Sequence, residues 1–318
     1  MQGYQPIPQG QIQGQYMPTA QPGTGGYVPP MQPGGYSSQP NPQGYYNQPI
    51  PQPGYVGPPL FGNIQYVYVP DPMVELANST SVQIRQEVQL FEQISGCESP
   101  NRYYVFSQSP QGGMKLLFKC KEYSECCQRN CCPADAREFN MYIKHIASAA
   151  NLNESFTNNF VNVNKPFKCT CCCLERPEML ANFASNNNPL GRIKQLFTCC
   201  DPEFNVYDNT GNKKYFITAD CCQCGLCCKN NVCGKMSEVI FNIYPSGNIS
   251  SPCGSIIKKP ANFAELITSA DSYQVNFPVD ATPNDKMMLI IAGLMIDYQY
   301  FEEKAGSNNA QHQHHYNY

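Results

Sequence analysis

Apolar and polar residues alternate along the chain from residue 80 onward. Even positions carry the apolar side chains of Val82, Ile84, Val88, Leu90 and Ile94. The odd positions between them are polar, with Phe91 as the exception. A period of two places every second side chain on the same face of a β-strand, so the pattern predicts a strand although Gln and Glu favour helix.

The same alternation returns in short segments that are separated by turn sequences. Two apolar runs, 103–106 and 114–118, flank a Pro-Gln-Gly-Gly turn, which predicts a β-hairpin. Two more hairpins are predicted around the turns 186–191 and 209–212. The other strands are expected at 138–144, 159–169, 179–185, 192–198, 204–208, 213–220, 237–244, 254–258 and 272–277. About a dozen short strands at regular spacing are typical of a β-sandwich or a β-barrel.

One segment near the C-terminus has a different pattern. Residues 287–296 form an uninterrupted apolar run, which predicts a helix over 285–304 with Asn284 or Asp285 as its N-cap. The run includes Met287, Leu289, Ile290, Ile291, Leu294 and Ile296, and Asp297 follows it directly. Ten residues span only about 15 Å, half of a bilayer core, so we expect a core helix enclosed by the barrel, with Asp297 paired or at the barrel mouth. Insertion into a membrane, with Asp297 at an interface, is the alternative.

Residues 1–72 have another composition altogether. The first charged residue is Asp71, and residues 1–60 contain 14 of the 28 prolines and 11 of the 23 glycines. Such a segment has too little aliphatic surface to offset the entropy lost on ordering, so we expect it to be disordered, like the His- and Asn-containing tail 306–318. Pro30 and Pro33 have the PxxP spacing, which makes SH3- or WW-type domains candidate partners; a plain flexible tail is the alternative.

Charge and composition narrow the function. The net charge of −3 and the pI of about 5.8 provide no basic field, so no nucleic-acid partner is expected. His145 is the only histidine outside the C-terminal tail. Catalysis by a Ser-His-Asp triad or by paired histidines is therefore not expected. No secretory signal is recognisable, so the cytosol is the expected compartment. In that compartment 19 cysteines, an odd number, do not predict a disulfide framework.

Three groups of residues, in order along the chain, resemble those of a known family. Residues 125–132, Glu-Cys-Cys-Gln-Arg-Asn-Cys-Cys, are similar to its Cys-Cys-x-Arg-Asn-Cys-Cys block. Residues 166–173, Pro-Phe-Lys-Cys-Thr-Cys-Cys-Cys, are similar to its cysteine-rich acylation segment. Residues 277–280, 286–287 and 296–302 resemble its C-terminal signature. By these blocks the segment 73–305 resembles the phospholipid scramblases.

The resemblance implies a mainly β, tubby-like fold: a closed antiparallel barrel of about twelve strands around the buried C-terminal helix. It also implies calcium-stimulated, ATP-independent, bidirectional movement of phospholipids between bilayer leaflets, without covalent chemistry and therefore without catalytic residues. Members of the family are anchored by S-acylated cysteines, so we expect membrane association at the cytosolic face, at the plasma membrane, with membrane phospholipids as partners. The sequence does not indicate an oligomeric state.

The calcium loop of that family corresponds to residues 269–280. Here Ser269, Asp271 and Asp280 stand at loop positions 1, 3 and 12, and Asp285 follows within reach. Ser269 replaces an Asp of the family pattern, and loop position 6 is not Gly, so the segment is not an EF-hand. With so few carboxylates the loop predicts a weak Ca²⁺ site. Because residues 273–277 also alternate, a plain barrel strand with an Asp near each end is the competing interpretation.

The cysteines have three interpretations. Acylation ranks first, at Cys169, Cys171, Cys172 and Cys173, because two long acyl chains anchor a protein stably, and Lys165 and Lys168 would add weak attraction to an anionic surface. Structural Zn²⁺ ranks second, since the Cys-x-x-Cys at 224–227 has the spacing of zinc sites. The candidate zinc ligands are Cys221, Cys222, Cys224, Cys227, Cys228 and Cys233. Adjacent cysteines diverge on an extended chain, which counts against zinc, and reduced thiols without a role are the third interpretation.

Three functions from different classes therefore remain open. The first is phospholipid scrambling. The second is an acylated, membrane-docked adaptor that binds lipid or protein without transport and recruits partners through its Pro-rich tail. The third is a zinc-stabilised structural protein. A barrel filled by its own helix offers no polar path to a lipid headgroup, which counts against the first, and leaflet exchange in liposomes distinguishes the first from the second.

Overall fold

The structure, a computed structural model, describes residues 66–87, 100–108, 114–133, 135–148, 158–170, 175–228, 231–260 and 271–302. The chain divides into two compact units, residues 1–50 and 51–318, and every described residue belongs to the second. The expected tail 306–318, and all of the expected tail 1–72 except its last residues, lie outside the described residues.

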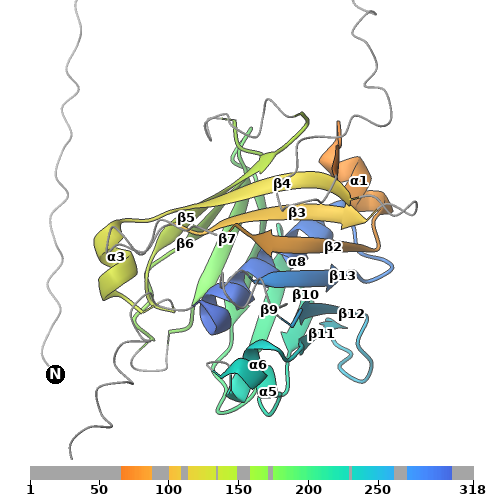
Figure 1. Ribbon diagram of the computed structural model, residues 1–318. Helices are drawn as coiled ribbons and strands as arrows, with labels where there is room; N and C mark the ends of the chain where they lie inside the picture. Colours follow the sequence, from red (N-terminus) through yellow and green to blue (C-terminus); the bar gives the residue numbers. More distant parts are fainter. Residues whose placement is uncertain are drawn as a thin grey trace, which may run out of the picture. The chain divides into compact units, whose positions relative to one another are not determined.

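The second unit is built on one sheet of thirteen strands (Figure 1). They are β1 (Tyr66–Tyr68), β2 (Ser81–Gln86), β3 (Arg102–Gln108), β4 (Met114–Tyr123), β5 (Phe139–His145), β6 (Val161–Lys165), β7 (Glu178–Phe183), β8 (Pro189–Gln195), β9 (Glu203–Asp208), β10 (Lys213–Thr218), β11 (Val239–Pro245), β12 (Gly254–Lys258) and β13 (Ser272–Asn276). From β2 to β13 each strand pairs antiparallel with the next, and β13 pairs antiparallel with β2. The result is a closed barrel of twelve strands, to which β1 adds in parallel beside the start of β4.

The helices are short, with one exception. They are α1 (Pro72–Asn78), α3 (Cys126–Cys131), α5 (Cys224–Cys227), α6 (Val232–Lys235) and α8 (Pro283–Ile296). One π-helical turn, η2 (Asp297–Phe301), continues α8. Figure 1 shows α8 running through the inside of the barrel, with α1 and α3 at opposite ends of the long strands.

Helix α8 forms the centre of the hydrophobic core. All its residues from Asp285 to Ile296 are buried, and so are the inward side chains of the strands around it, such as Val82 and Ile84 on β2 and Val275 on β13. A helix that is apolar on every side requires such an enclosure, because no face of it suits water. Within the described ranges, no helix combines the length and the apolar character that crossing a bilayer requires.

The helix begins two to three residues earlier than the sequence predicts. Thr282, not Asn284 or Asp285, is the N-cap, and its hydroxyl accepts a 3.2 Å hydrogen bond from the backbone N of Asp285. The Asp285 carboxylate accepts in return from the backbone N of Thr282 at 3.0 Å, which completes a capping box. Pro283 at the first helical position fits the same arrangement, because it has no N–H to satisfy there.

The remaining fold predictions can be compared directly with the structure. The mainly β fold, the closed antiparallel barrel of twelve strands and the enclosed C-terminal helix are confirmed. The strand expected over 82–94 is described as β2 only to Gln86, and 88–99 lie outside the described residues. The strand β1 and the short helices α1, α3, α5 and α6 were not predicted.

The contact between α8 and the barrel wall is close at two glycines. A Cβ at Gly191 on β8 would lie 2.4 Å from the carbonyl oxygen of Tyr207 and 3.0 Å from the sulfur of Met288 on α8. A Cβ at Gly293 on α8 would lie 3.0 Å from Cδ1 of Ile84. At Gly191 the nearest neighbour is backbone, so a side chain there would prevent this approach, whereas at Gly293 the nearest neighbour is the flexible end of a side chain.

Candidate functional site

The connections between the strands alternate between the two ends of the barrel, because each strand runs antiparallel to its neighbours. The β4–β5, β6–β7, β8–β9 and β10–β11 connections therefore share one end. All the described cysteines except Cys120 and Cys253 lie on these four connections. We call this the cysteine-bearing end. Helix α1, the connection from β13 to α8 and the start of α8 lie at the other, which we call the α1 end.

Large apolar side chains are exposed on the same four connections. Phe167, between β6 and β7, is 55% exposed, and Phe197, between β8 and β9, is 58% exposed. Val232 and Met236, between β10 and β11, are exposed to a similar degree. Exposed cysteines and apolar side chains thus occur together at this end, a combination that suits contact with another apolar phase. Val74, Ile249 and Val279 are exposed to a similar or greater degree at the α1 end, so the cysteines rather than the apolar side chains distinguish the two ends.

The four acylation candidates are only partly described. Cys169 is exposed on the β6–β7 connection, whereas Cys171, Cys172 and Cys173 lie outside the described residues. The expected basic flank is wrong, because Lys165 is fully buried and its ammonium donates to the backbone oxygens of Asp135 and Arg137. Its neighbour Lys168 pairs with Glu178 at 3.0 Å. Neither lysine therefore offers an unpaired surface charge.

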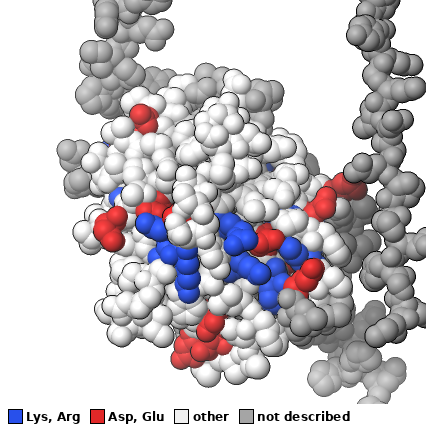
Figure 2. All heavy atoms as spheres, turned by 180° about the vertical axis from the view of Figure 1, so that it is seen from behind, with Lys and Arg blue, Asp and Glu red and all other residues white. Residues whose placement is uncertain are grey.

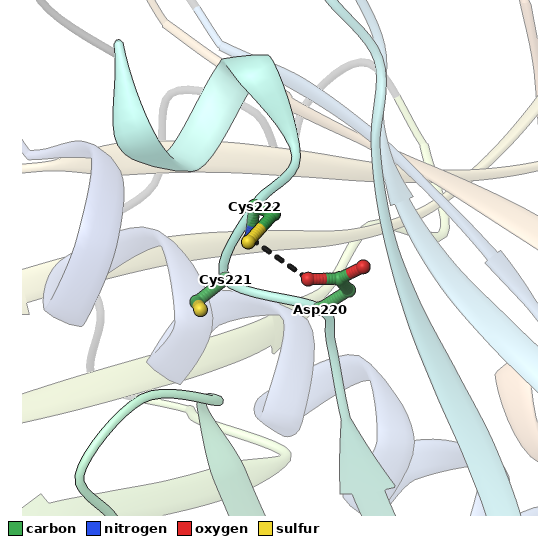
Figure 3. A group of neighbouring side chains, drawn as sticks. All are labelled: Asp220, Cys221 and Cys222. Atoms are coloured by element: carbon green, nitrogen blue, oxygen red, sulfur yellow. Dashed lines mark hydrogen bonds between the residues drawn. The ribbon is translucent and has the colours of Figure 1, made fainter.

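The β10–β11 connection holds the candidate zinc ligands. Figure 3 shows Asp220, Cys221 and Cys222 on one turn, where the backbone N of Cys222 donates a 2.8 Å hydrogen bond to the Asp220 carboxylate. The carboxylate oxygen and the two sulfurs all lie within 4.8 Å of one another. Among the residues that the structure describes, this is the group of three whose donor atoms converge in this way.

The other thiols of this connection form contacts in pairs. Sγ of Cys224 lies 3.6 Å from Sγ of Cys233, and Sγ of Cys227 lies 3.7 Å from Sγ of Cys228. The first pair depends on Gly225, where a Cβ would lie 2.3 Å from Val239 and 3.4 Å from the backbone of α6. Hydrogen bonds from Ser237 and Cys233 lower the pKa of the Cys224 thiol. On α3, by contrast, Cys126 is disulfide-bonded.

The candidate calcium ligands lie at both ends of the barrel. Asp271 precedes β13 at the cysteine-bearing end and pairs with the buried Lys258 at 2.7 Å. Asp280 and Asp285 follow β13 at the α1 end, where their charges raise the pKa of Tyr215, after the larger effect of burial. Five strand residues at about 3.3 Å each separate the two ends, too far for oxygens that share one ion at about 2.4 Å. The structure brings Asp280 and Asp285 to one end and leaves Asp271 at the other; Ser269 lies outside the described residues.

A cavity of about 170 Å³ opens beside the start of α8. It is lined by Leu190, Val206, Tyr207, Asp208, Asn209, Lys214, Thr282, Asn284, Asp285 and Met288. The ammonium of Lys214 lies 4.0 Å from the Asp285 carboxylate. The cavity therefore combines two carboxylates, Asp208 and Asp285, with one cation that partly offsets their charge.

A buried polar cluster occupies the cysteine-bearing end of the barrel interior. Asp297, the first residue of η2, is 2% exposed and accepts hydrogen bonds from the hydroxyls of Tyr103 and Tyr273. Burial raises the pKa of Asp297 to about 7, the charge of Asp271 adds to this, and the two tyrosine bonds oppose it. The prediction that Asp297 is paired agrees with this geometry.

Four more charged or polar side chains extend this cluster, and the sequence did not single them out. The Tyr298 hydroxyl donates to Glu122 at 2.8 Å, and the Arg137 guanidinium bonds Glu302 at 2.5 Å and Glu122 at 3.4 Å. Burial raises the pKa of Glu302 to about 7, although Arg137 acts in the opposite direction. The only sequence signal for such a buried cluster was that a charged residue stands alone within an apolar strand or helix. A surface position explains that pattern equally well.

The outer surface carries charges of both signs. Figure 2 shows Lys and Arg side chains gathered in a band across one face, with Asp and Glu side chains next to them. Ion pairs of this kind include Glu178 with Lys168 and with Arg192.

Comparisons with known proteins identify the family of the chain. Residues 62–303 match the model of the Scramblase family, so the chain belongs to the scramblase family. It is 26% identical to phospholipid scramblase 2 of Bos taurus over 233 residues, which are 70% of this chain and 69% of that protein. It is also 26% identical to phospholipid scramblase 1 of Mus musculus and of Homo sapiens, over 71% of this chain and 62% and 64% of those proteins.

Proposed function

We propose that this protein moves phospholipids between the leaflets of a bilayer, in both directions and without ATP. The observation that carries the proposal is the family match over residues 62–303, together with relatives that are named phospholipid scramblases. Scrambling transfers a lipid down its gradient without making or breaking a covalent bond, so it requires neither a nucleophile nor a general base. Membership in this family favours such lipid translocation over covalent catalysis.

The cysteine-bearing end of the barrel is proposed to face the membrane, at the cytosolic side of the plasma membrane. Acyl chains on Cys169, Cys171, Cys172 and Cys173 would provide the anchor, because each buried methylene contributes about 0.8 kcal/mol and two chains hold a protein stably. The exposed side chains of Phe167 and Phe197 on neighbouring connections support this orientation. Because the buried helix α8 would stay inside the barrel, lipids would not pass through the barrel. They would move within the bilayer, where the docked protein disturbs it.

Calcium stimulation belongs to the same proposal. Asp280 on an exposed turn and Asp285 at the start of α8 are near each other at the α1 end and support a weak site there. Asp271 and Ser269 would act on a second ion or after a rearrangement of the loop. Since α8 begins at this site and ends in the polar cluster at the cysteine-bearing end, a calcium-dependent shift of the helix would reach the proposed membrane face.

A second candidate function is a membrane-docked adaptor that binds lipid or protein without transport. The filled barrel favours it, because the described interior is occupied by apolar side chains of α8 and offers no polar route for a headgroup. In this case the acylated end would dock the barrel, and SH3- or WW-type domains would be recruited by the Pro-rich segment. A structural role for zinc is compatible with either function.

Leaflet exchange in reconstituted liposomes separates the two candidates. The full-length protein is incorporated into liposomes that contain a fluorescent phospholipid, and a membrane-impermeant reductant then destroys the fluorescence of the outer leaflet. Without ATP, added calcium should raise the lost fraction from about one half toward completeness, because inner-leaflet lipids become accessible. Binding to the liposomes with the lost fraction fixed at about one half would reject scrambling and favour the adaptor.

A further inference from the structure

The turn after β10 brings together metal-binding groups that scrambling does not use. Asp220, Cys221 and Cys222 provide one carboxylate and two thiols whose donor atoms lie within 4.8 Å of one another (Figure 3). The side chains of adjacent cysteines diverge on an extended strand, and for this reason the sequence alone does not favour zinc binding by Cys221 and Cys222. Here they lie on a tight turn instead, where their sulfurs and a carboxylate oxygen of Asp220 stay within 4.8 Å of one another.

The turn is held in this shape by bonds that need no metal. The Gln223 side chain bonds the backbone of Ile240 on β11 twice, accepting from its N at 2.7 Å and donating to its O at 2.9 Å. The backbone N of Cys222 donates to Oδ1 of Asp220, which leaves Oδ2 as the ligating oxygen. A site that is arranged before the ion arrives loses less entropy on binding.

The candidate for a fourth donor is Asp201 on the neighbouring β8–β9 connection, whose carboxylate does not converge with the other three donor atoms in the structure. Oδ1 of Asp201 accepts a 3.0 Å hydrogen bond from the backbone N of Cys221. A hydrogen bond to the same carboxylate raises the pKa of the Cys221 thiol to about 12. Asp201 is therefore held beside Cys221 by the backbone bond, and two separate connections would supply the set.

We propose that Asp201, Asp220, Cys221 and Cys222 bind one zinc ion at the cysteine-bearing end of the barrel. Zinc binds thiolates at about 2.3 Å and carboxylates at about 2.0–2.2 Å in a tetrahedron, whose donors are then separated by about 3.3–3.8 Å. The donor atoms of Asp220, Cys221 and Cys222, which lie within 4.8 Å of one another, would draw together by up to about 1 Å, and the Asp201 side chain would turn toward them. Calcium binds oxygen ligands alone and copper(I) prefers sulfur ligands alone, so two sulfurs with two carboxylates select zinc.

The nearby thiol pair, Cys224 with Cys233, is the natural control. Its sulfurs are in contact at 3.6 Å on α5 and α6. Within the described part of the chain, however, no third donor atom converges with both sulfurs in the way that the Asp220 group does. If zinc bound through a general affinity of thiols for metal, replacing either pair of cysteines would reduce zinc binding equally. A pre-formed site predicts a reduction only when Cys221 and Cys222 are replaced.

Binding at this site releases protons, since zinc binds the thiolate forms of Cys221 and Cys222. Each thiol loses its proton to the buffer, so about two protons are released for each ion. The zinc affinity of the protein should consequently increase with pH. Titration calorimetry in two buffers with different ionisation enthalpies measures this number directly.

The experiment uses the reduced full-length protein and zinc ion alone as the probe. Calorimetry should show one zinc ion per chain, and cobalt(II) should give the near-ultraviolet charge-transfer band of a metal–thiolate bond. The double variant C221S/C222S should lose both signals, while C224S/C233S should retain them. Asp201→Asn should weaken zinc binding at least tenfold without abolishing the cobalt band, because both thiolates remain.

Three results would overturn the proposal: no zinc binding by the wild type at micromolar ion, unchanged binding by C221S/C222S, or an equal loss in C224S/C233S. Circular dichroism in the presence of a chelator verifies that each variant is folded. If C221S/C222S does not fold, Asp220→Asn with Asp201→Asn replaces it, and undiminished zinc affinity in that variant rejects the site. Loss of zinc without loss of leaflet exchange would separate this site from the proposed function.

Discussion

The hydroxyl of Tyr103, at the start of β3, donates a 2.5 Å hydrogen bond to Oδ2 of Asp297 at the start of η2, 194 residues further along the chain. Tyr273 on β13 donates to the other oxygen of the same carboxylate. Two strands of the barrel wall are thereby joined to the end of the central helix. Because burial raises the pKa of Asp297 to about 7, the protonation state of this carboxyl group is coupled to folding.

The stability of the barrel should decrease as pH rises from about 5 to 7. Unfolded Asp has a pKa of about 3.9, so in this range the folded protein binds a proton at Asp297 that the unfolded chain has lost. The free energy of unfolding then decreases with pH, by at most about 1.4 kcal/mol per pH unit for each such proton. Glu302, whose pKa burial also raises to about 7, contributes in the same direction.

Urea unfolding at pH 5, 6 and 7 measures this dependence. Asp297→Asn should reduce the slope by about half, because Glu302 still titrates, and D297N/E302Q should leave little slope. A D297N variant with the same pH dependence as the wild type would show that Asp297 does not titrate in this range.

Gly191→Ala should destabilise the barrel by about 1–3 kcal/mol, because the new methyl group collides with the Tyr207 backbone and with Met288 on α8. Gly293→Ala is the matched control. Its methyl group comes closest to the flexible end of Ile84, with Val275 and Ile256 at ordinary contact distances of 3.6 and 3.8 Å. Alanine also gains up to about 1 kcal/mol of helix propensity, so the net change should stay within about 1 kcal/mol. Thermal unfolding compares the two, and equal stability of both variants would contradict an α8 packed tightly against β8.

Asp280→Asn should shift the calcium midpoint of leaflet exchange to roughly tenfold higher calcium, since one of the two carboxylates at the α1 end is lost. Its melting temperature should be unchanged, because Asp280 lies on an exposed turn. Asp271→Asn should instead lower the melting temperature through the lost ion pair with Lys258, and should shift the midpoint much less than Asp280→Asn, because Asp271 lies at the other end of the barrel and would contribute only through a second ion. If D271N alone shifted the midpoint, the calcium site would belong at the cysteine-bearing end.

Replacing Cys169, Cys171, Cys172 and Cys173 by serine should move the protein from the membrane to the soluble fraction of expressing cells. The reason is the loss of thioester-linked acyl chains, which hydroxylamine also removes from the wild type. The matched control is C199S/C200S, which changes two exposed cysteines on another connection of the same end. Fractionation and intact mass measure the outcome, and equal membrane retention of both variants would place the anchor elsewhere.

The barrel could be predicted from the sequence because each of its strands and turns leaves a pattern within a few neighbouring residues. Alternation of apolar residues marks each strand, and the turns predicted at 186–191 and 209–212 mark where the chain reverses, although β8 begins already at Pro189 and includes Gly191. The apolar run 287–296 could belong only inside protein or lipid, and its length favoured protein. The strand β1 was not predicted because three residues are too few to show an alternation of apolar and polar positions. The helices α5 and α6 were not predicted because a single helical turn shows no helical periodicity.

The candidate sites were harder to predict, because they depend on contacts between residues that are far apart in the sequence. Glu122 and Arg137 are ordinary charges in the sequence, and only the closed barrel turns them toward Glu302. The location of the cysteines at one end could have been inferred, because they fall on every second connection of an up-and-down barrel. The separation of Asp271 from Asp280 could also have been inferred from the alternation at 273–277, which requires an extended chain between them.

The proposed function depends most on which end of the barrel meets the bilayer. The chain contains no Trp, so a single introduced Trp reports on this without background. Phe167→Trp places the reporter at the cysteine-bearing end, and Val279→Trp places it on a fully exposed turn at the α1 end. The acylated protein is bound to liposomes that contain phospholipids with brominated acyl chains, which quench Trp at contact distance. We expect strong quenching of F167W, its loss after hydroxylamine, and none in V279W; quenching of V279W with F167W unaffected would contradict the account.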